Sequence, residues 1–261
     1  MSGGASDLEA MEVHHRGVVM PWECDDMGHM NIRFHVARYE QALRHAAADA
    51  PGARAGARRV ADRFSFVKEA RVGARVACSL RLPPQAAAAA PLTGCLWDMG
   101  SGEVLARFET LFADPEKDCL AGEILGDMAW RDQPVEREWI TAMGASPSPA
   151  ADGHDLGSVV TGAVSDANAV AVLDLSRGSG YRAEESRVGF VVAELVVAYA
   201  GEWPAGARAF SVRSALLSRS ARSLRFRHVV GVGGVGVAFV RSACVFFDRD
   251  ARRAVGVPFC V

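Results

Sequence analysis

The chain contains an internal repeat, and this repeat restricts the fold more than any other feature of the sequence. Similar residues recur at a spacing of 141 early in the repeat and of 133 later: Val18-Val19 with Val159-Val160, Asp25 with Asp166, Phe66 with Tyr199, and Gly73-Ala74-Arg75 with Gly206-Ala207-Arg208. Shared spacing over several elements predicts two copies of one α+β unit. We expect each copy to contain a leading strand, one helix and four further strands.

Hydrophobic periodicity places these elements along the chain. Phe34, Ala37, Leu43 and Ala46 fall near a 3.6-residue period, which predicts a helix over residues 30–48 after a short strand at Val18–Met20. Strand patterns follow at Phe64–Glu69, Arg75–Leu82, Pro91–Trp97 and Val104–Ala113 in the first copy, and at Phe210–Leu217, Ser223–Val230 and Val237–Phe247 in the second. The turn residues Asp98–Gly102 predict a hairpin between the last two strands of the first copy.

Proline and glycine mark the boundary between the copies. Residues 114–143 are expected to form a surface excursion with a short helix around Glu136–Ala142. The stretch Ser146–Gly153 is rich in Ser, Pro and Ala and predicts a linker. We therefore expect an N-terminal domain over 13–143, a linker over 144–153 and a C-terminal domain over 154–261.

Composition excludes several classes of function. The net charge of −2 over 261 residues gives no electrostatic footprint for nucleic acid or an anionic membrane. The longest apolar run, Val229–Val240, is too short to span a bilayer, and the N-terminus has no signal-peptide pattern. The six cysteines lack the paired spacing of a zinc site. We expect a cytoplasmic protein without metal or cofactor, whose thiols mostly fill the core.

Gly231–Gly236 matches the dinucleotide-binding pattern GxGxxG letter for letter. That site requires a helix directly after the glycines, so that the pyrophosphate meets the helix N-terminus. Here the strand pattern Val237–Val240 follows instead. The glycines therefore predict a hairpin and not a nucleotide site.

The stretch Trp22–Asn31 carries the strongest functional signal. It places three acids, one histidine and one glycine where a strand is predicted to turn into a helix. Such a turn exposes unpaired backbone N–H groups and the positive end of a helix dipole, which suit a developing negative charge. A plain helix cap by Asp25 or Asp26 is the simpler alternative, but one cap needs fewer polar residues. Cys24 is a weak candidate nucleophile because its acidic neighbours raise a thiol pKa.

At these residues the chain resembles the hotdog-fold thioesterases of the 4-hydroxybenzoyl-CoA thioesterase type. The family pattern is a strand, a pair of acids, a Gly-His-x-Asn group and an aromatic residue on the helix that follows. The sequence shows Glu23-Cys24-Asp25, Gly28-His29-Met30-Asn31 and Phe34 in register. It departs from the pattern at Glu23, where the family has Asp, and at Phe34, where Tyr is common.

The resemblance implies two tandem hotdog units, each an antiparallel sheet wrapped around one long helix, packed as a pseudo-dimer. In the aligned second copy, Asp166 alone is retained, while Ala169, Val170 and Val172 replace the Gly, His and Asn. We therefore expect one working site in the first unit, with the second unit as its scaffold and wall. The fused chain is expected to form a homodimer.

The resemblance also implies an acyl-CoA thioesterase, with an acyl-CoA or acyl-carrier thioester as substrate. Asp25 would act as nucleophile or general base, and the N–H groups of Gly28 and His29 would form the oxyanion hole. His29 would orient Asp25 or donate to the thioester, and Asn31 would position the turn or a water molecule. The substrate-side neighbours are Glu23, Trp22 and Phe34.

Two alternatives stay open at this point. A non-catalytic acyl-CoA-binding protein would keep the fold but lack hydrolysis, because fold alone does not fix function. A hotdog hydratase or dehydratase is the third reading, and the Gly28–Asn31 motif argues against it. The acyl group, and the arginines that would meet the phosphates of CoA, do not follow from the sequence.

Overall fold

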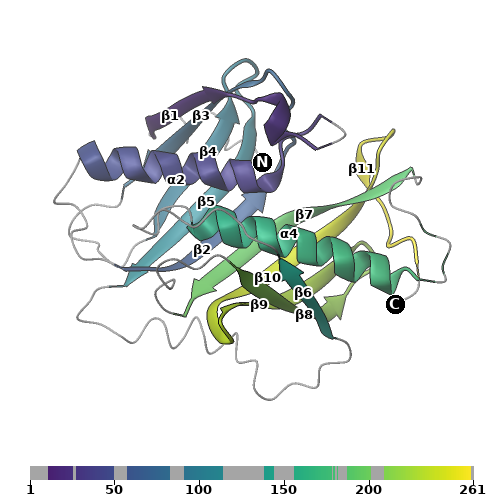
Figure 1. Cartoon of the computed structure of the whole chain (residues 1–261). Coiled ribbons are helices and arrows are strands. Elements are labelled where there is room, and N and C mark those ends of the chain that lie inside the picture. Colours follow the sequence, from purple (N-terminus) through teal and green to yellow (C-terminus); the bar gives the residue numbers. More distant parts are fainter. Residues whose placement is uncertain are drawn as a thin grey trace.

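A computed structural model describes residues 11–25, 28–49, 58–82, 91–113, 138–143, 156–177, 179, 181, 187–200 and 209–259. The described strands form one antiparallel sheet, and two helices lie side by side against one of its faces (Figure 1). The first part of the chain contains β1 (Glu12–Val18), the 3-10 helix η1 (Pro21–Glu23), α2 (Ile32–Asp49), β2 (Arg58–Phe66), β3 (Arg75–Arg81), β4 (Leu92–Asp98) and β5 (Val104–Ala113). The rest contains β6 (Glu138–Met143), α4 (Leu156–Leu175), β7 (Val188–Tyr199), β8 (Phe210–Arg219), β9 (Ser223–Val232), β10 (Val235–Asp248) and β11 (Arg253–Ala254).

The sheet has the order β1-β3-β4-β5-β2-β7-β10-β9-β8-β6, with β11 beside β10. From either edge of the sheet toward its middle, the strands follow an equivalent order: β1, β3, β4, β5 and β2 from one edge, and β6, β8, β9, β10 and β7 from the other. We call β1 to β5 with α2 the first half, and β6 to β11 with α4 the second half. Strands β2 and β7 join the halves in the middle, where Ala61 pairs with Ala198 and Ser65 with Glu194. The predicted order of strand, helix and four strands in each copy is confirmed.

The predicted alignment of the two copies is wrong at its start. Val159 and Val160 belong to helix α4, although the repeat places them on a strand. Asp166, the predicted counterpart of Asp25, lies in the middle of the same helix with an exposed side chain. The cause is composition: α4 is apolar or small on nearly every side, so short windows of β-branched valines imitate a buried strand.

The segment before the second helix also differs from the prediction. The helix predicted around Glu136–Ala142 is wrong, because β6 occupies these positions and pairs with β8. This ladder attaches β6 to the second half, whereas the predicted domain boundary at residue 143 gives it to the first. The predicted linker over 144–153 lies outside the described residues. The leading strand is longer and earlier than predicted, since β1 begins at Glu12 and ends at Val18.

The core lies between the sheet and the two helices. The buried face of α2 includes Val36 and Tyr39, and Tyr39 stacks on Phe108 of β5 with ring centroids 4.5 Å apart. Helix α4 buries mainly alanine, glycine and valine, so its backbone lies close to its neighbours. Its length and apolarity would also suit a membrane span, but half of that window is buried inside the protein, as in a core helix.

A buried polar network connects the halves at the start of α4. Glu40 of α2 is almost completely buried, and its carboxylate accepts hydrogen bonds from the N–H of Gly157 (2.8 Å) and of Ser158 (3.2 Å). Arg59 Nη1 of β2 donates to the same carboxylate at 2.9 Å, and Arg59 Nη2 lies 2.6 Å from Asp62. The first amides of α4 are therefore satisfied by a side chain of the first half.

Candidate active site

The stretch from Asp25 to Asn31 forms a tight turn that leads into α2. The carbonyl of Asp25 accepts a hydrogen bond from Gly28 N–H at 2.9 Å, and Asp25 N–H donates to the carbonyl of His29 at 2.8 Å. Gly28 has a φ of +73°, a left-handed conformation that glycine adopts without strain. Among the described residues, no atom beyond the two chain neighbours lies within 4 Å of the position that a Cβ of Gly28 would take. This position therefore requires glycine for its backbone angle and not for lack of space.

Asn31 is the residue that caps α2. Its Oδ1 accepts a hydrogen bond from Arg33 N–H at 3.0 Å, and its carbonyl accepts one from Phe34 N–H at 2.9 Å. The simpler alternative in the sequence gave this role to Asp25 or Asp26, and the structure gives it to the asparagine. Asp25 is left to another partner: its Oδ1 accepts a hydrogen bond of 3.0 Å from His29 N–H. The turn thus holds Asp25 in place from the backbone.

The predicted oxyanion donors are already occupied. Gly28 N–H donates to the Asp25 carbonyl and His29 N–H to the Asp25 carboxylate. The amide of Ile32, the first residue of α2, has no hydrogen-bond partner among the described residues. Ile32 also lines the cavity described next. Of these three amides, the one at the helix start is therefore the one without a hydrogen-bond partner among the described residues.

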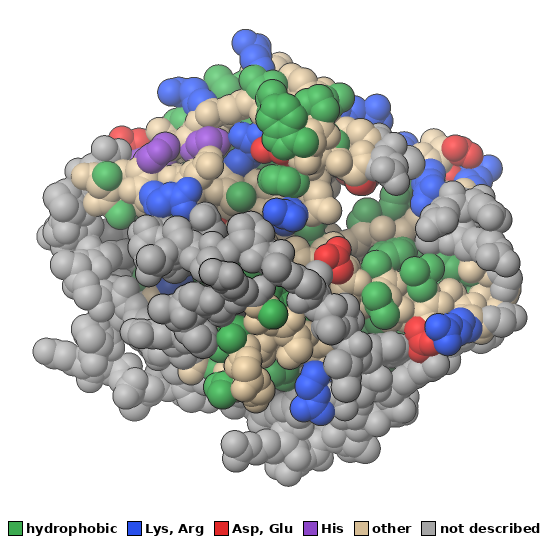
Figure 2. Space-filling model, viewed as in Figure 1, with side chains coloured by type: hydrophobic (Ala, Val, Ile, Leu, Met, Phe, Trp, Pro, Cys, Tyr) green, Lys and Arg blue, Asp and Glu red, His purple; other side chains and the backbone are tan. Residues whose placement is uncertain are grey.

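A cavity of about 580 Å³ lies between the two halves, beside this turn. Figure 2 shows the surface hollowed between the part that carries β1 and the part that carries β11. The first half contributes the turn, the start of α2 and the segment after β2: Asp25, His29, Met30, Asn31, Ile32, His35, Phe66, Val67, Lys68 and Glu69. The second half contributes Ser165, Phe190, Val191, Val192, Val245, Phe247, Arg252, Arg253 and Ala254.

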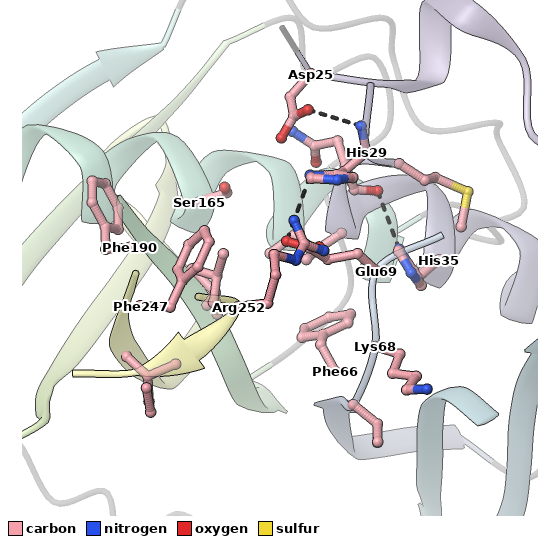
Figure 3. Close-up of a pocket in the computed structure, with 18 of the residues that line it drawn as sticks. Asp25, His29, His35, Phe66, Lys68, Glu69, Ser165, Phe190, Phe247 and Arg252 are labelled. Carbon is pink, nitrogen blue, oxygen red and sulfur yellow. Dashed lines mark hydrogen bonds and ion pairs between the residues drawn. The ribbon is translucent and has the colours of Figure 1, made fainter. Parts of the chain in front are cut away.

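The two walls differ in chemistry. Figure 3 shows Phe190 and Phe247 on the side of the second half, opposite Asp25, His29 and Glu69. Apart from Ser165, the second half contributes apolar residues from β7, the end of β10 and β11, together with Arg252 of the β10–β11 turn and Arg253 of β11. One wall therefore offers acid–base groups, and the facing wall offers an apolar surface. This arrangement suits a ligand with a polar reactive group and an apolar chain.

His29 joins the two walls through its side chain. Its Nδ1 lies 3.5 Å from Glu69 Oε1, and the other oxygen of Glu69 contacts Arg252 of the second half (Figure 3). Burial lowers the pKa of the His29 imidazole below its usual value; Asp25 opposes this effect, and the charges of Arg252 and Arg71 add to it. The imidazole is therefore held in its neutral form around neutral pH.

Three predicted substrate-side residues do not line this cavity. Glu23 points into the first half, where its carboxylate pairs with Arg38 at 2.6 Å and accepts Met20 N–H at 2.8 Å. Trp22 is 71% exposed on η1, and Phe34 packs beside the core under the guanidinium of Arg33. Glu23 therefore stabilises the turn, and Trp22 and Phe34 are not among the residues that line the cavity. Among the predicted catalytic residues, Gly28 shapes the turn, while Asp25, His29 and Asn31 reach the cavity.

Three of the four described thiols follow the prediction that the thiols mostly fill the core, while Cys119 and Cys260 lie outside the described residues. Cys78, Cys95 and Cys244 are buried in the core. Cys24 lies in the turn, where its Sγ donates to the carbonyl of Met20 at 3.5 Å, and it does not line the cavity. Burial, followed by the charges of Asp25 and Glu23, raises the pKa of this thiol. A nucleophilic role for Cys24 is not supported by these surroundings.

Sequence reasoning missed the residues that reach the cavity from elsewhere in the chain. Lys68 and Glu69 lie just beyond the end of β2, and Glu69 was predicted only as the last residue of a strand. Arg252 lies in the turn between β10 and β11 and is the one non-glycine residue of the described chain with a positive φ, 53°. A cluster of charge in this turn, Asp248 to Arg253, is the signal that was available.

No family model matches the sequence, and no curated protein matches it. Solved structures do match the fold. An acyl-ACP thioesterase from Bacteroides thetaiotaomicron aligns with a TM-score of 0.58 at 12% identity, covering 92% of this chain and 98% of its own. An acyl-CoA thioesterase II from Mycobacterium marinum aligns with a TM-score of 0.55 at 12% identity, covering 91% and 96%.

A protein of unknown function with a hotdog fold from Alicyclobacillus acidocaldarius aligns over 95% of this chain and 99% of its own, with a TM-score of 0.56 at 13% identity. At such identities the likeness concerns the fold alone. The chain spans nearly the whole length of these proteins, two of which are named thioesterases. The protein therefore has the hotdog fold that these thioesterases share.

Proposed function

We propose that this protein is a thioester hydrolase that cleaves an acyl-CoA or acyl-carrier thioester at the cavity beside Asp25. The observation that carries the proposal is the position of the Asp25 carboxylate, held by His29 N–H at 3.0 Å in a cavity with an apolar opposite wall. The thioesterases among the fold neighbours support the reaction class. Fold similarity alone does not establish it.

Asp25 is the residue to which we assign the first chemical step. Its carboxylate either attacks the thioester carbonyl or removes a proton from an attacking water molecule. In both routes the carbonyl oxygen gains negative charge and the carbon–sulfur bond breaks. In the water route the departing thiolate takes up the proton that Asp25 removed. In the direct route the acyl group forms an anhydride with Asp25, and a water molecule then hydrolyses this anhydride to the free acid and the free carboxylate and supplies the proton that the thiolate takes up. We assign the oxyanion to the Ile32 amide at the start of α2, because this donor is unoccupied among the described residues and the helix dipole favours negative charge there.

The acyl group would occupy the apolar wall of the second half, against Phe190, Val192 and Phe247. The CoA or carrier-protein part of the substrate would extend out of the cavity on the side that is lined by two exposed cations, Lys68 and Arg253. Guanidinium and ammonium groups suit the phosphates that both CoA and phosphopantetheine carry. This orientation brings the thioester between the apolar chain and the charged carrier, beside Asp25.

We further propose that the chain is a tandem pair of hotdog units packed like a dimer of single units. The mirrored strand order and the antiparallel β2–β7 junction support this arrangement. We place the boundary between β5 and β6, because β6 pairs with β8. The predicted homodimer of the fused chain remains part of this proposal, and light scattering of the purified protein tests it.

Release of free thiol from a panel of acyl-CoA and acyl-carrier-protein thioesters tests the function. The wild type is expected to release thiol from at least one of them, and Asp25→Asn is expected to slow the release about 10²-fold or more. Glu12→Gln serves as the matched control, because it removes an exposed carboxylate of β1 outside the cavity. Tight binding of acyl-CoA without release from any thioester would favour the non-catalytic binding protein instead.

A further inference from the structure

The turn between β10 and β11 is held by several hydrogen bonds to Asp248. Asp248 Oδ1 accepts hydrogen bonds from the N–H of Asp250 (3.0 Å) and of Ala251 (2.9 Å), and from Arg187 Nε at 2.9 Å. The carbonyl of Asp248 accepts Arg252 N–H at 2.8 Å. These bonds fix the backbone of the turn up to Arg252.

Arg252 leaves this turn in a strained backbone conformation. Its φ of 53° lies in the left-handed region, which is unfavourable for a residue that has a Cβ atom. Glycine would adopt the same angle freely. Strained backbone conformations of this kind cluster at active sites and ligand-binding sites, where a side chain has a functional role.

The side chain of Arg252 reaches the first half and lines the cavity. Its Nη2 contacts Glu69 Oε2, and Glu69 Oε1 lies 3.5 Å from His29 Nδ1 (Figure 3). His29 Nε2 is buried and has no hydrogen-bond partner among the described residues. Glu69 is thus the only polar side chain of the described structure that orients the His29 ring. Arg252 in turn orients Glu69.

We propose that Arg252 is a positioning residue of the active site, which reaches over from the second half and holds Glu69 against the His29 imidazole. Glu69 then keeps the proton of the neutral ring on Nδ1 and fixes the ring plane. The inference rests on the proposed thioester hydrolase and deepens it. It also assigns the second half a polar contribution to the site, beyond the apolar wall.

The charges around His29 make the proposal testable without a substrate. Burial lowers the pKa of the His29 ring. The charge of Asp25 opposes this effect, and the charges of Arg252 and Arg71 add to it. The carboxylate of Glu69 is in contact with the ring. Removing the cation of Arg252 therefore raises the pKa of His29. Nuclear magnetic resonance of the histidine side chains is the direct readout. Arg252→Met is expected to move the His29 titration to higher pH and to change its tautomer signature.

The same variant is expected to lower kcat about 10- to 100-fold, as loss of a supporting contact to a functional histidine does. Arg252→Lys keeps a cation for Glu69 and is expected to recover part of the rate. Arg252→Gly removes the side chain but suits the positive φ, so it is expected to be as slow as Arg252→Met without losing stability. Arg177→Met removes an exposed arginine at the end of α4 and is the matched control.

A double-mutant cycle separates a direct role from one that acts through Glu69. If Arg252 acts through Glu69, Arg252→Met lowers kcat no further in a Glu69→Gln background. Additive losses, or a His29 titration identical in wild type and Arg252→Met, would overturn the inference. If the wild type hydrolyses no thioester, the proposed function fails, and the titration still decides whether Arg252 controls His29.

Discussion

The N–H of His29 donates a 3.0 Å hydrogen bond to the carboxylate of Asp25, four residues earlier in the chain. The histidine that the sequence motif places beside the acid thus orients it through its backbone, while its ring contacts Glu69. The carboxylate position is therefore a property of the turn. A substitution at Asp25 can keep or break this bond independently of the charge.

Asp25→Asn and Asp25→Ala separate these two contributions. Asp25→Asn removes the carboxylate, and its activity is expected to fall about 10²-fold or more. The asparagine side-chain oxygen still accepts the hydrogen bond from His29 N–H, so the stability is expected to change little. The alanine variant loses the hydrogen bond as well, and its free energy of unfolding is expected to fall by about 1 kcal/mol further. Thiol release and urea denaturation measure both. Full activity in Asp25→Asn would remove Asp25 from the chemistry.

Gly28→Ala is expected to destabilise the protein by about 1 kcal/mol, because its φ of +73° disfavours any Cβ although the space is open. Gly234→Ala is the matched control: Gly234 has a φ of +85°, equally open surroundings, and a place in the β9–β10 turn away from the cavity. Both variants are expected to lose similar stability, but only Gly28→Ala should also slow thiol release. Equal activity in the two variants would show that the turn from Asp25 to Asn31 can change its backbone conformation without loss of catalysis.

Burial raises the pKa of Glu40 to about 7, against opposing effects of Arg59. Because the folded state favours the protonated acid, the contribution of Glu40 to stability is complete below its unfolded pKa of about 4.5 and declines as pH rises through 7. The full effect is about 3 kcal/mol. Glu40→Gln is expected to flatten the dependence of the unfolding free energy on pH between 5 and 8. Glu109→Gln, on the surface, should leave the slope as in wild type.

Val245→Phe is expected to shorten the accepted acyl group, because Val245 lines the apolar wall of the cavity. Each methylene that the pocket no longer accommodates costs about 10-fold or more in kcat/KM. Long acyl chains should lose activity and short ones keep it. Val235→Phe adds the same bulk at a residue that is 66% exposed and outside the cavity, and should preserve the chain-length profile. A uniform loss over all chains would argue against an acyl site at this wall.

The sequence predicts the local features well, because their causes are local. The strand Val104–Ala113 and the hairpin at Asp98–Gly102 occur as predicted, and Gly231–Gly236 forms the β9–β10 turn with positive φ at Gly233 and Gly234. Alternation and turn chemistry settle such elements within a few residues. The candidate site followed from the motif for the same reason: Asp25, His29 and Asn31 lie within one turn.

Relationships between distant segments were not predictable. Helix α2 begins at Ile32 and α4 at Leu156, 124 residues later, whereas the chosen alignment used 141. Counted from the helix starts, Gly153-His154 precedes α4 much as Gly28-His29 precedes α2. These two residues lie outside the described structure, within and beside the predicted linker. A repeat located by single residue matches gave the right order of elements with the wrong register.

The contact of Arg252 with Glu69 joins residues 183 positions apart and depends on one backbone angle. No pattern in the chain encodes that angle, since arginine rarely adopts a positive φ. The same holds for Glu40, a helix residue whose charge is compensated by an amide of the other half. From the sequence alone, a charged residue of this kind is predicted to be solvent-exposed, because the position of the element that carries its partner is not known.

Glu40 has a consequence for binding stoichiometry. At the start of α2 the Ile32 amide is open to a ligand, while at the start of α4 the carboxylate of Glu40 already occupies the amides of Gly157 and Ser158. The second helix start thus has its first amides bonded to the Glu40 side chain in place of a substrate. A pair of identical units would bind two thioesters, and this chain is expected to bind one.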